Sequence, residues 1–139
     1  MRFNNQGISL LKLLIFVAIF GLFIGGGFVL LNNERAKTRD AQRLADMARV
    51  QAAFEFLFND NASYSPAAIN GCDSTGQLVS QCNLAQYLPQ IAQIKDPGRF
   101  TYTISQVPSD QGFGITFSLE KGYQSIKAGQ HILTHSGIK

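Results

Sequence analysis

The amino-acid sequence predicts an α+β fold in which a long N-terminal helix packs on a small antiparallel sheet of about three to four strands. Three observations predict it: an apolar run at residues 8–31, helical periodicity at residues 34–58, and alternating apolar residues between 100 and 135. The chain therefore divides into a short stretch of residues 1–7, a membrane half of the helix, and a head of residues 32–139.

The apolar run is 24 residues long, and only Ser9 and Lys12 in it are polar. An α-helix rises ~1.5 Å per residue, so ~20 apolar residues cross a ~30 Å hydrocarbon core. The alternative is a secretory signal peptide, whose apolar core is usually ~7–15 residues and ends at a small-x-small cleavage site. Residues 32–35 contain no such site. We therefore expect a retained, single-pass membrane helix.

The head has 108 residues, which is enough for about one small domain. The whole chain has a net charge of +3 and a pI near 9.0. This mildly basic balance does not by itself indicate a nucleic-acid-binding protein.

Cys72 and Cys82 are the only cysteines, and nine residues separate them in one polar loop. They can close a short ring, and a disulfide requires an oxidising compartment. The alternative is two free thiols or half of a metal site, although no nearby histidine or second cysteine pair completes a zinc set. We expect the disulfide, with the head outside the cytoplasm.

A basic cluster follows the apolar run, and by the positive-inside rule it indicates the opposite orientation. It outnumbers Arg2 on the other side of the run. The cysteines, together with the short N-terminal leader at residues 1–7, outweigh this charge signal. Together with Arg49 the cluster also permits DNA binding, although a solvated or filament-buried charged face is the commoner explanation. The cluster comprises Arg35, Lys37, Arg39 and Arg43.

The helix at residues 34–58 is amphipathic, because its larger apolar residues recur at spacings of three and four. Charged residues take the other faces, where the neighbours Asp40 and Arg43, like Asp46 and Arg49, contribute ~0.2–0.5 kcal/mol in an isolated helix. The apolar face comprises Leu44, Met47, Val50, Phe54, Leu57 and Phe58.

No proline interrupts residues 8–61, so the membrane half and the amphipathic half can form one continuous helix. Its weak place is the run Gly25, Gly26 and Gly27, because glycine costs ~1 kcal/mol relative to alanine in a helix interior.

Turns and strands follow Pro66. Asn83 suits an N-cap and Pro89 a stop, which predicts one or two helical turns between them. The connection at residues 107–112 suits a hairpin, which makes the sheet antiparallel. Alternation of apolar residues predicts three strands, at residues 100–106, 112–119 and 131–135.

A short basic leader ending in Gly7, followed by Ile8-Ser9-Leu10-Leu11-Lys12-Leu13-Leu14, resembles the start of type IV pilins and type II secretion pseudopilins, where glycine precedes Phe-Thr-Leu-Ile-Glu-Leu-Leu. The resemblance extends over nearly the whole chain and is to the major pseudopilin group. It includes residues 36–47, residues 56–66, Tyr87-Leu88-Pro89, Asp96-Pro97 and residues 133–138.

This resemblance implies a pilin-like fold and a structural subunit without enzymatic activity or cofactor. A prepilin peptidase would cut after Gly7 on the cytoplasmic side and methylate the new amine of Ile8. With an inner-membrane assembly platform, the subunits would leave the cytoplasmic membrane for a cell-surface or periplasmic filament. Apolar helices would lie at its centre and heads outside.

The family's acidic residue falls on Lys12, which reverses the charge. In the family this carboxylate meets the N-terminal amine of a neighbour, and an ammonium would repel that amine. Two interpretations remain open. Either Lys12 reaches lipid headgroups, or it pairs with an acidic residue of a different subunit. The second makes the chain a minor or tip subunit.

Other candidate sites are weaker. His131 and His135 share one strand parity, but without placed carboxylates they suit surface or sheet positions better than a catalytic or metal site. Some members of the family bind calcium near the sheet. Asp73, Asp96 and Asp110 offer oxygen ligands here, although their spacing does not specify a site.

The alternative function is a single-pass anchored module whose head binds an extracytoplasmic ligand without polymerising. The sequence contains no nucleophile motif and no glycine-rich phosphate loop.

Overall fold

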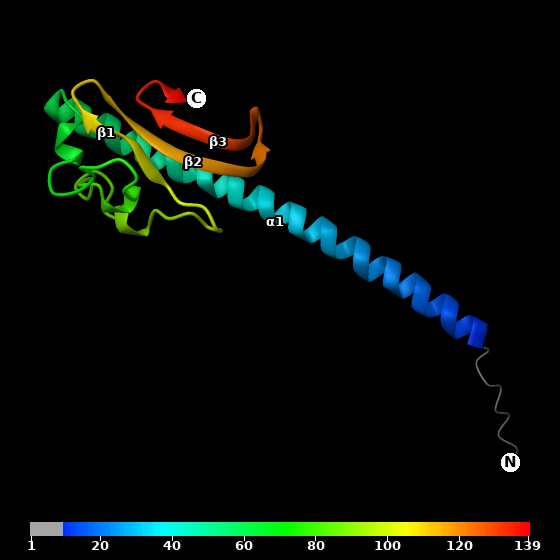
Figure 1. Ribbon diagram of the computed structural model, residues 1–139. Helices are drawn as coiled ribbons and strands as arrows, with labels where there is room; N and C mark the ends of the chain where they lie inside the picture. The colour runs from blue at the N-terminus through cyan, green and yellow to red at the C-terminus, as the bar shows by residue number, and fades with distance from the viewer. Residues whose placement is uncertain (1–9) are drawn as a thin grey trace, which may run out of the picture. The chain divides into compact units, whose positions relative to one another are not determined.

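The computed structural model describes residues 10–139, except for the side chains of residues 24–29. Contacts divide the chain into two compact units with their boundary between Arg35 and Ala36, and we call the second, Ala36–Lys139, the head unit. The architecture is α+β with a four-stranded antiparallel sheet, as the sequence predicts (Figure 1).

The helix α1 spans Leu10–Asn61 and includes residues 25–27, the glycines predicted as its weak place. Within the described part of the chain, no helix is both long enough and apolar enough to cross a membrane. The membrane span predicted at residues 8–31 is therefore not confirmed. The predicted processing residues Gly7 and Ile8 lie outside the described residues.

In the head unit, α1 buries one apolar face against the sheet (Figure 1). Met47, Val50, Phe54 and Leu57 lie on this face and are buried, which confirms the predicted amphipathic pattern. The ring of Phe54 stacks on Phe113 of the sheet with centroids 3.9 Å apart. The predicted Phe58 is 37% exposed and Leu44 is half-buried, so these two lie at the margin.

The sheet has the order β1-β2-β3-β4, and every neighbouring pair is antiparallel. The two-residue turn between β1 and β2 confirms the predicted hairpin. The last strand has two residues and pairs with the end of β3. The bounds are Thr103–Ser109 for β1, Gly112–Tyr123 for β2, Ile126–Thr134 for β3 and Gly137–Ile138 for β4.

Strand β1 begins three residues later than predicted, because its pairing with β2 starts at Thr103, and its other edge pairs with a loop. Val79 N donates to Tyr102 O, and Ile104 N donates to Gln77 O. Residues 76–79 thus cover the outer edge of β1. The Cys72–Cys82 disulfide closes the loop that contains them, which confirms the predicted bridge.

Of the one or two helical turns predicted between Asn83 and Pro89, the structure has one, without the predicted N-cap. The Asn83 side chain instead donates from Nδ2 to Pro66 O at 3.5 Å, and its backbone N donates to Ala67 O. A single turn remains, in which Leu88 N donates to Leu84 O. Short 3₁₀ helices lie elsewhere in the loops, at Ser65–Ala67 (η1), Val79–Gln81 (η2) and Ile91–Gln93 (η3).

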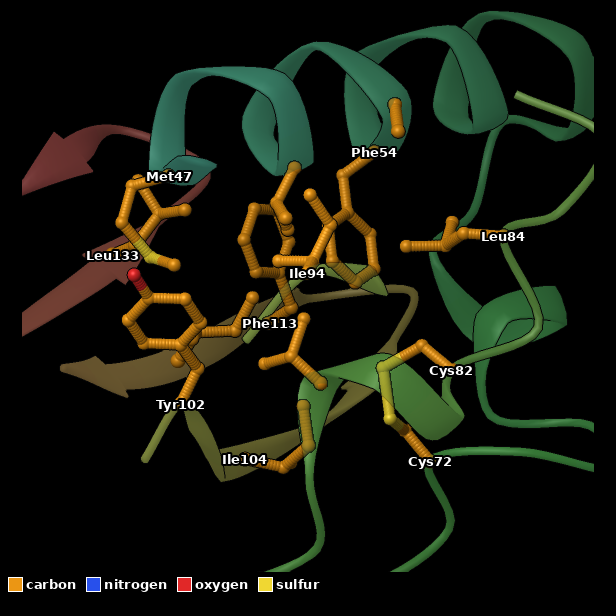
Figure 2. Packing of buried hydrophobic residues seen from close by; sticks show 14 of the residues in the cluster. Met47, Phe54, Cys72, Cys82, Leu84, Ile94, Tyr102, Ile104, Phe113 and Leu133 are labelled. Atoms are coloured by element: carbon orange, nitrogen blue, oxygen red, sulfur yellow. A yellow bond between two sulfur atoms is a disulfide. The ribbon is translucent and has the colours of Figure 1, made fainter. Parts of the chain in front are cut away.

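The hydrophobic core of the head unit joins α1, the loops and the sheet (Figure 2). Figure 2 shows Met47 and Phe54 of α1 facing Phe113 and Leu133 of the sheet, with the disulfide at one side of the cluster. Both cysteines are buried, at 0% and 4% exposure, so the bridge belongs to the core.

Candidate functional site: an apolar helix surface and a buried ionic network

The first candidate site is the apolar helix surface, which we define as the large apolar side chains of α1 from Leu10 to Phe23. Their exposed fractions run from 49% to 81%. Successive residues of an α-helix are ~100° apart, so these side chains point in every direction around the axis. The surface comprises Leu10, Leu11, Leu13, Leu14, Ile15, Phe16, Val17, Ile19, Phe20, Leu22 and Phe23.

A helix that is apolar all round is stable where apolar surroundings cover it. Burial of one Leu, Ile or Phe side chain is worth ~1.5–3 kcal/mol. Each uncovered residue of the apolar helix surface therefore favours association with lipid or with other apolar helices.

Lys12 is the only charged residue in the sequence from Leu10 to Phe23, and it is exposed. An ammonium in apolar surroundings requires a carboxylate, a headgroup or water to compensate its lost hydration. Any partner that covers the apolar helix surface must therefore provide a polar contact at Lys12.

The second candidate site is an ionic network inside the head unit, and its first member is Asp40. The Asp40 carboxylate is fully buried and accepts hydrogen bonds from three consecutive amides of β2, at 2.7–3.0 Å. These amides belong to Glu120, Lys121 and Gly122, where β2 has a register shift against β3. The bulge aims the amides at one point, and Asp40 fills the anion site that they form.

Gly122 makes this bulge sterically permissible. Its φ is +85°, a value that L side chains rarely adopt, and a Cβ there would lie 2.5 Å from the carbonyl oxygen of Ile126.

Arg43 lies one turn after Asp40 and is also fully buried. It donates two hydrogen bonds to Asp96, one to Asp40 at 2.7 Å and one to Glu120 at 2.9 Å. Its guanidinium carbon also lies 4.9 Å from the centre of the Phe100 ring. All of its charge is therefore compensated within the head unit.

Arg39 completes the ionic network, which we define as Arg39, Asp40, Arg43, Asp96 and Glu120. It donates two hydrogen bonds to Glu120, at 2.6 and 2.7 Å. The sequence pattern predicts that Arg39, Asp40 and Arg43 of the helix face outward. The structure shows otherwise, because acids of the loop and the sheet offer partners that an isolated helix lacks.

The carboxyl groups of the ionic network are held in their charged form. Burial raises the pKa of Asp40, but the backbone amides and Arg43 outweigh it and lower that pKa below its usual range. The pKa of Asp96 is lowered in the same way, because hydrogen bonds from Arg43 and from two backbone amides outweigh the effect of its burial. Hydrogen bonds from Arg39, with Arg43, lower the pKa of Glu120 to about 2.

Asp46 differs from the carboxyl groups of the ionic network, because its pKa is raised and not lowered. The hydroxyl of buried Tyr102 donates to its carboxylate at 3.2 Å, and Arg49 lies 3.6 Å away with a 62% exposed side chain. Burial raises the pKa of Asp46 because this weak, exposed cation does not offset the lost hydration. Burial also raises the pKa of Tyr102.

The predicted calcium ligands have separate partners. Asp96 is bound to Arg43, Asp110 accepts hydrogen bonds from Ser63 and Ser65, and Asp73 accepts one from Ser74. Across residues 10–139, no three His, Cys, Asp or Glu side chains form a group that could hold a metal ion.

The two histidines contact different parts of the head unit. A ring nitrogen of His131 lies 2.8 Å from the carbonyl oxygen of Lys127, and its ring lies against Phe117. His135 follows the end of β3 and lies near Tyr64.

The predicted basic face of the helix is also interrupted. Arg43 is inaccessible and Arg39 is paired with Glu120, so neither contributes to a solvent-facing basic surface for DNA. Residue spacing within α1 could not reveal this, because Asp96 and Glu120 lie 53 and 77 positions from Arg43 in the sequence.

No protein-family model, curated protein or solved structure matches this chain.

Proposed function

We propose that this chain is a structural subunit of a helical filament, either a type IV pilus or a type II secretion pseudopilus, and that it has no catalytic role. The apolar helix surface carries the proposal, together with the resemblance of residues 1–14 to the start of pilins and pseudopilins. A helix of this kind needs apolar surroundings on every side.

Before assembly, residues 8–31 lie in the cytoplasmic membrane and the head lies outside the cytoplasm. This span rests on the sequence, because residues 8 and 9 and the side chains of 24–29 are not described. The Cys72–Cys82 disulfide supports an oxidising location for the head.

During assembly, the apolar helix surface exchanges lipid for the helices of neighbouring subunits. This exchange costs little, because lipid chains and packed apolar side chains are similar surroundings and an α-helix satisfies its own backbone hydrogen bonds.

Lys12 points to the place of the subunit in such a filament. Identical helices packed around it would bring like charges together in apolar surroundings. A different subunit with a carboxylate at the facing position would compensate the ammonium. We therefore assign this chain to a minor or tip position, next to an acidic major subunit.

Processing of the N-terminus tests the proposal. The full chain is produced in a bacterial membrane together with a prepilin peptidase, and mass spectrometry identifies its mature N-terminus. We expect an N-terminus at Ile8 with a methylated amine. The variant Gly7→Leu should keep residues 1–7, whereas the matched control Gly21→Leu, at a position with open space around it, should be processed normally.

An intact leader in the unaltered chain would contradict the proposal and favour the anchored, non-polymerising module. Cleavage at another peptide bond, to the same extent in Gly7→Leu and Gly21→Leu, would also contradict the proposal, because residues 1–7 would then not be a prepilin leader.

A further inference from the structure

The head unit has a polar hollow of about 260 Å³ at the end of α1. It lies where the last residues of α1 meet η1 and the loop around Tyr87. The polar side chains that line it are Asp60, Asn61, Asn83, Gln86 and Tyr87.

Hydrogen bonds hold one wall of the hollow in place. The hydroxyl of Tyr87 donates to Asp60 Oδ2 at 2.9 Å and accepts from Asn61 Nδ2 at 3.3 Å. Asn61 Nδ2 also donates to the carbonyl oxygen of Leu57 at 2.9 Å. These bonds orient one carboxylate, one carboxamide and one aromatic ring before any ligand binds.

Several polar groups of the hollow are still available. Asn83 uses its Nδ2 in one long contact of 3.5 Å with Pro66 O. Among the described residues, neither the Gln86 amide nor the Oδ1 atoms of Asp60 and Asn61 have a hydrogen-bond partner. The hollow therefore offers both donors and acceptors.

The lining excludes several classes of ligand. None of its described residues is Lys, Arg or His, so a phosphate or another anion finds no charge partner. Asp60 is its only carboxylate, which is little for a divalent cation. The donor and acceptor groups suit a neutral ligand that is rich in hydroxyls, because each hydroxyl both donates and accepts.

We infer that this hollow binds one saccharide ring, with the Asp60, Asn83 and Gln86 side chains on its hydroxyls and Tyr87 alongside. Its volume of about 260 Å³ lies just below the ~300 Å³ at which small-molecule pockets usually begin, which suits no more than a single ring. The same chemistry recognises a free sugar and the end of a surface glycan. This inference does not depend on the proposed filament function.

The test is an NMR titration of the full chain, labelled with ¹⁵N, in a zwitterionic detergent without a sugar headgroup. The probes are the methyl glycosides of glucose, galactose and N-acetylglucosamine. We expect at least one to shift the side-chain amide signals of Asn61, Asn83 and Gln86 in a saturable way, with a Kd of about 1 mM.

Gln86→Ala should weaken binding of that probe about tenfold, whereas the matched control Gln93→Ala, an exposed residue outside the hollow, should leave the Kd unchanged. The amide shifts of the unaltered chain decide the matter even if a variant misfolds. Absence of shifts with all three probes would overturn the inference. Equal weakening in both variants, or shifts with calcium chloride alone, would do so too.

A glycan array with the same full chain distinguishes the two ligand sources. Binding to immobilised glycans with the same terminal ring indicates a surface glycan. Binding only to the soluble glycoside indicates a free sugar. Either result supports a saccharide site.

Discussion

The guanidinium of Arg43 donates two hydrogen bonds to the carboxylate of Asp96, at 2.5 and 2.9 Å, across 53 positions of the sequence. Both side chains are almost completely buried, at 0% and 1% exposure. A buried pair is often no more stabilising than apolar residues of the same volume. Loss of one partner, however, leaves an uncompensated charge and costs ~3–5 kcal/mol.

The first prediction follows from this pair. Arg43→Met should lower the free energy of unfolding by ~3–5 kcal/mol, because the carboxylates of the ionic network lose their shared cation. Arg49→Met on the same helix is the matched control and should cost less than ~1 kcal/mol, since its side chain is 62% exposed. Urea unfolding followed by tyrosine fluorescence measures both. Equal losses would contradict a special role for Arg43.

Acid should destabilise the head unit. The pKa values of Asp40, Asp96 and Glu120 are lowered in the folded chain, and that of Glu120 to about 2. Such groups stabilise the fold above their unfolded values of ~4, and this contribution is lost as the pH falls through the folded values. The free energy of unfolding should therefore fall between about pH 4.5 and pH 2.

Glu120→Gln checks this assignment. The variant should be less stable than the unaltered chain at pH 7, and its stability should fall less steeply below pH 4.5, because one titrating group with a lowered pKa is gone. Parallel pH profiles of the two proteins would show that Glu120 does not contribute to the acid transition.

Gly122→Ala should destabilise the head unit by ~2–4 kcal/mol, because the added methyl group meets the Ile126 carbonyl oxygen and the positive φ is strained. Gly76→Ala is a close control. Its φ is +86° against +85° for Gly122, but a Cβ there has nothing within 4 Å. The difference between the two variants in thermal unfolding isolates the steric contact, and a difference near zero would argue against a tight bulge.

Loss of the Cys72–Cys82 disulfide should lower the free energy of unfolding by ~2–3 kcal/mol, because the loop it closes is short. Residues 76–79 should then leave the edge of β1. Hydrogen exchange should accelerate at the amides of Val79 and Ile104, which bond across this edge, and less at Ile115 in the centre of the sheet. Uniform acceleration would instead indicate global unfolding.

Lys12→Glu should reduce incorporation of the chain into filaments that contain an acidic major subunit, because two carboxylates would then meet in apolar surroundings. Lys12→Gln removes the attraction to the partner's carboxylate without adding repulsion, so it should reduce incorporation less than Lys12→Glu does. Immunoblots of sheared filaments, with and without the major subunit, measure incorporation. Unchanged incorporation of Lys12→Glu in both backgrounds would refute hetero-subunit pairing.

The strands could be predicted from the sequence where burial alternates. Phe113, Ile115, Phe117 and Leu119 are all buried on β2, as their alternation indicates. Strand β3 begins at Ile126, five residues before the predicted start. The sequence pattern does not reveal these added residues, because they are mostly exposed and carry no apolar alternation.

The ionic network could not be predicted in this way. Periodicity within α1 shows Asp40 and Arg43 as neighbours, but it cannot show that a bulge of β2 faces them. That bulge forms in a segment about 80 positions later in the chain. The polar hollow was missed for a similar reason, since it joins residues of the helix end to Gln86 in a loop.

The hydrogen bonds between Asp40 and the β2 bulge also have a mechanical consequence. A helix held on a sheet by apolar contacts alone can roll or slide by a fraction of a turn at small cost, because those contacts have no direction. One carboxylate bonded to three successive amides opposes both motions, because hydrogen bonds are directional. Tension applied along α1 within the head unit would therefore reach the sheet as shear on these short bonds, and helix and sheet would move together.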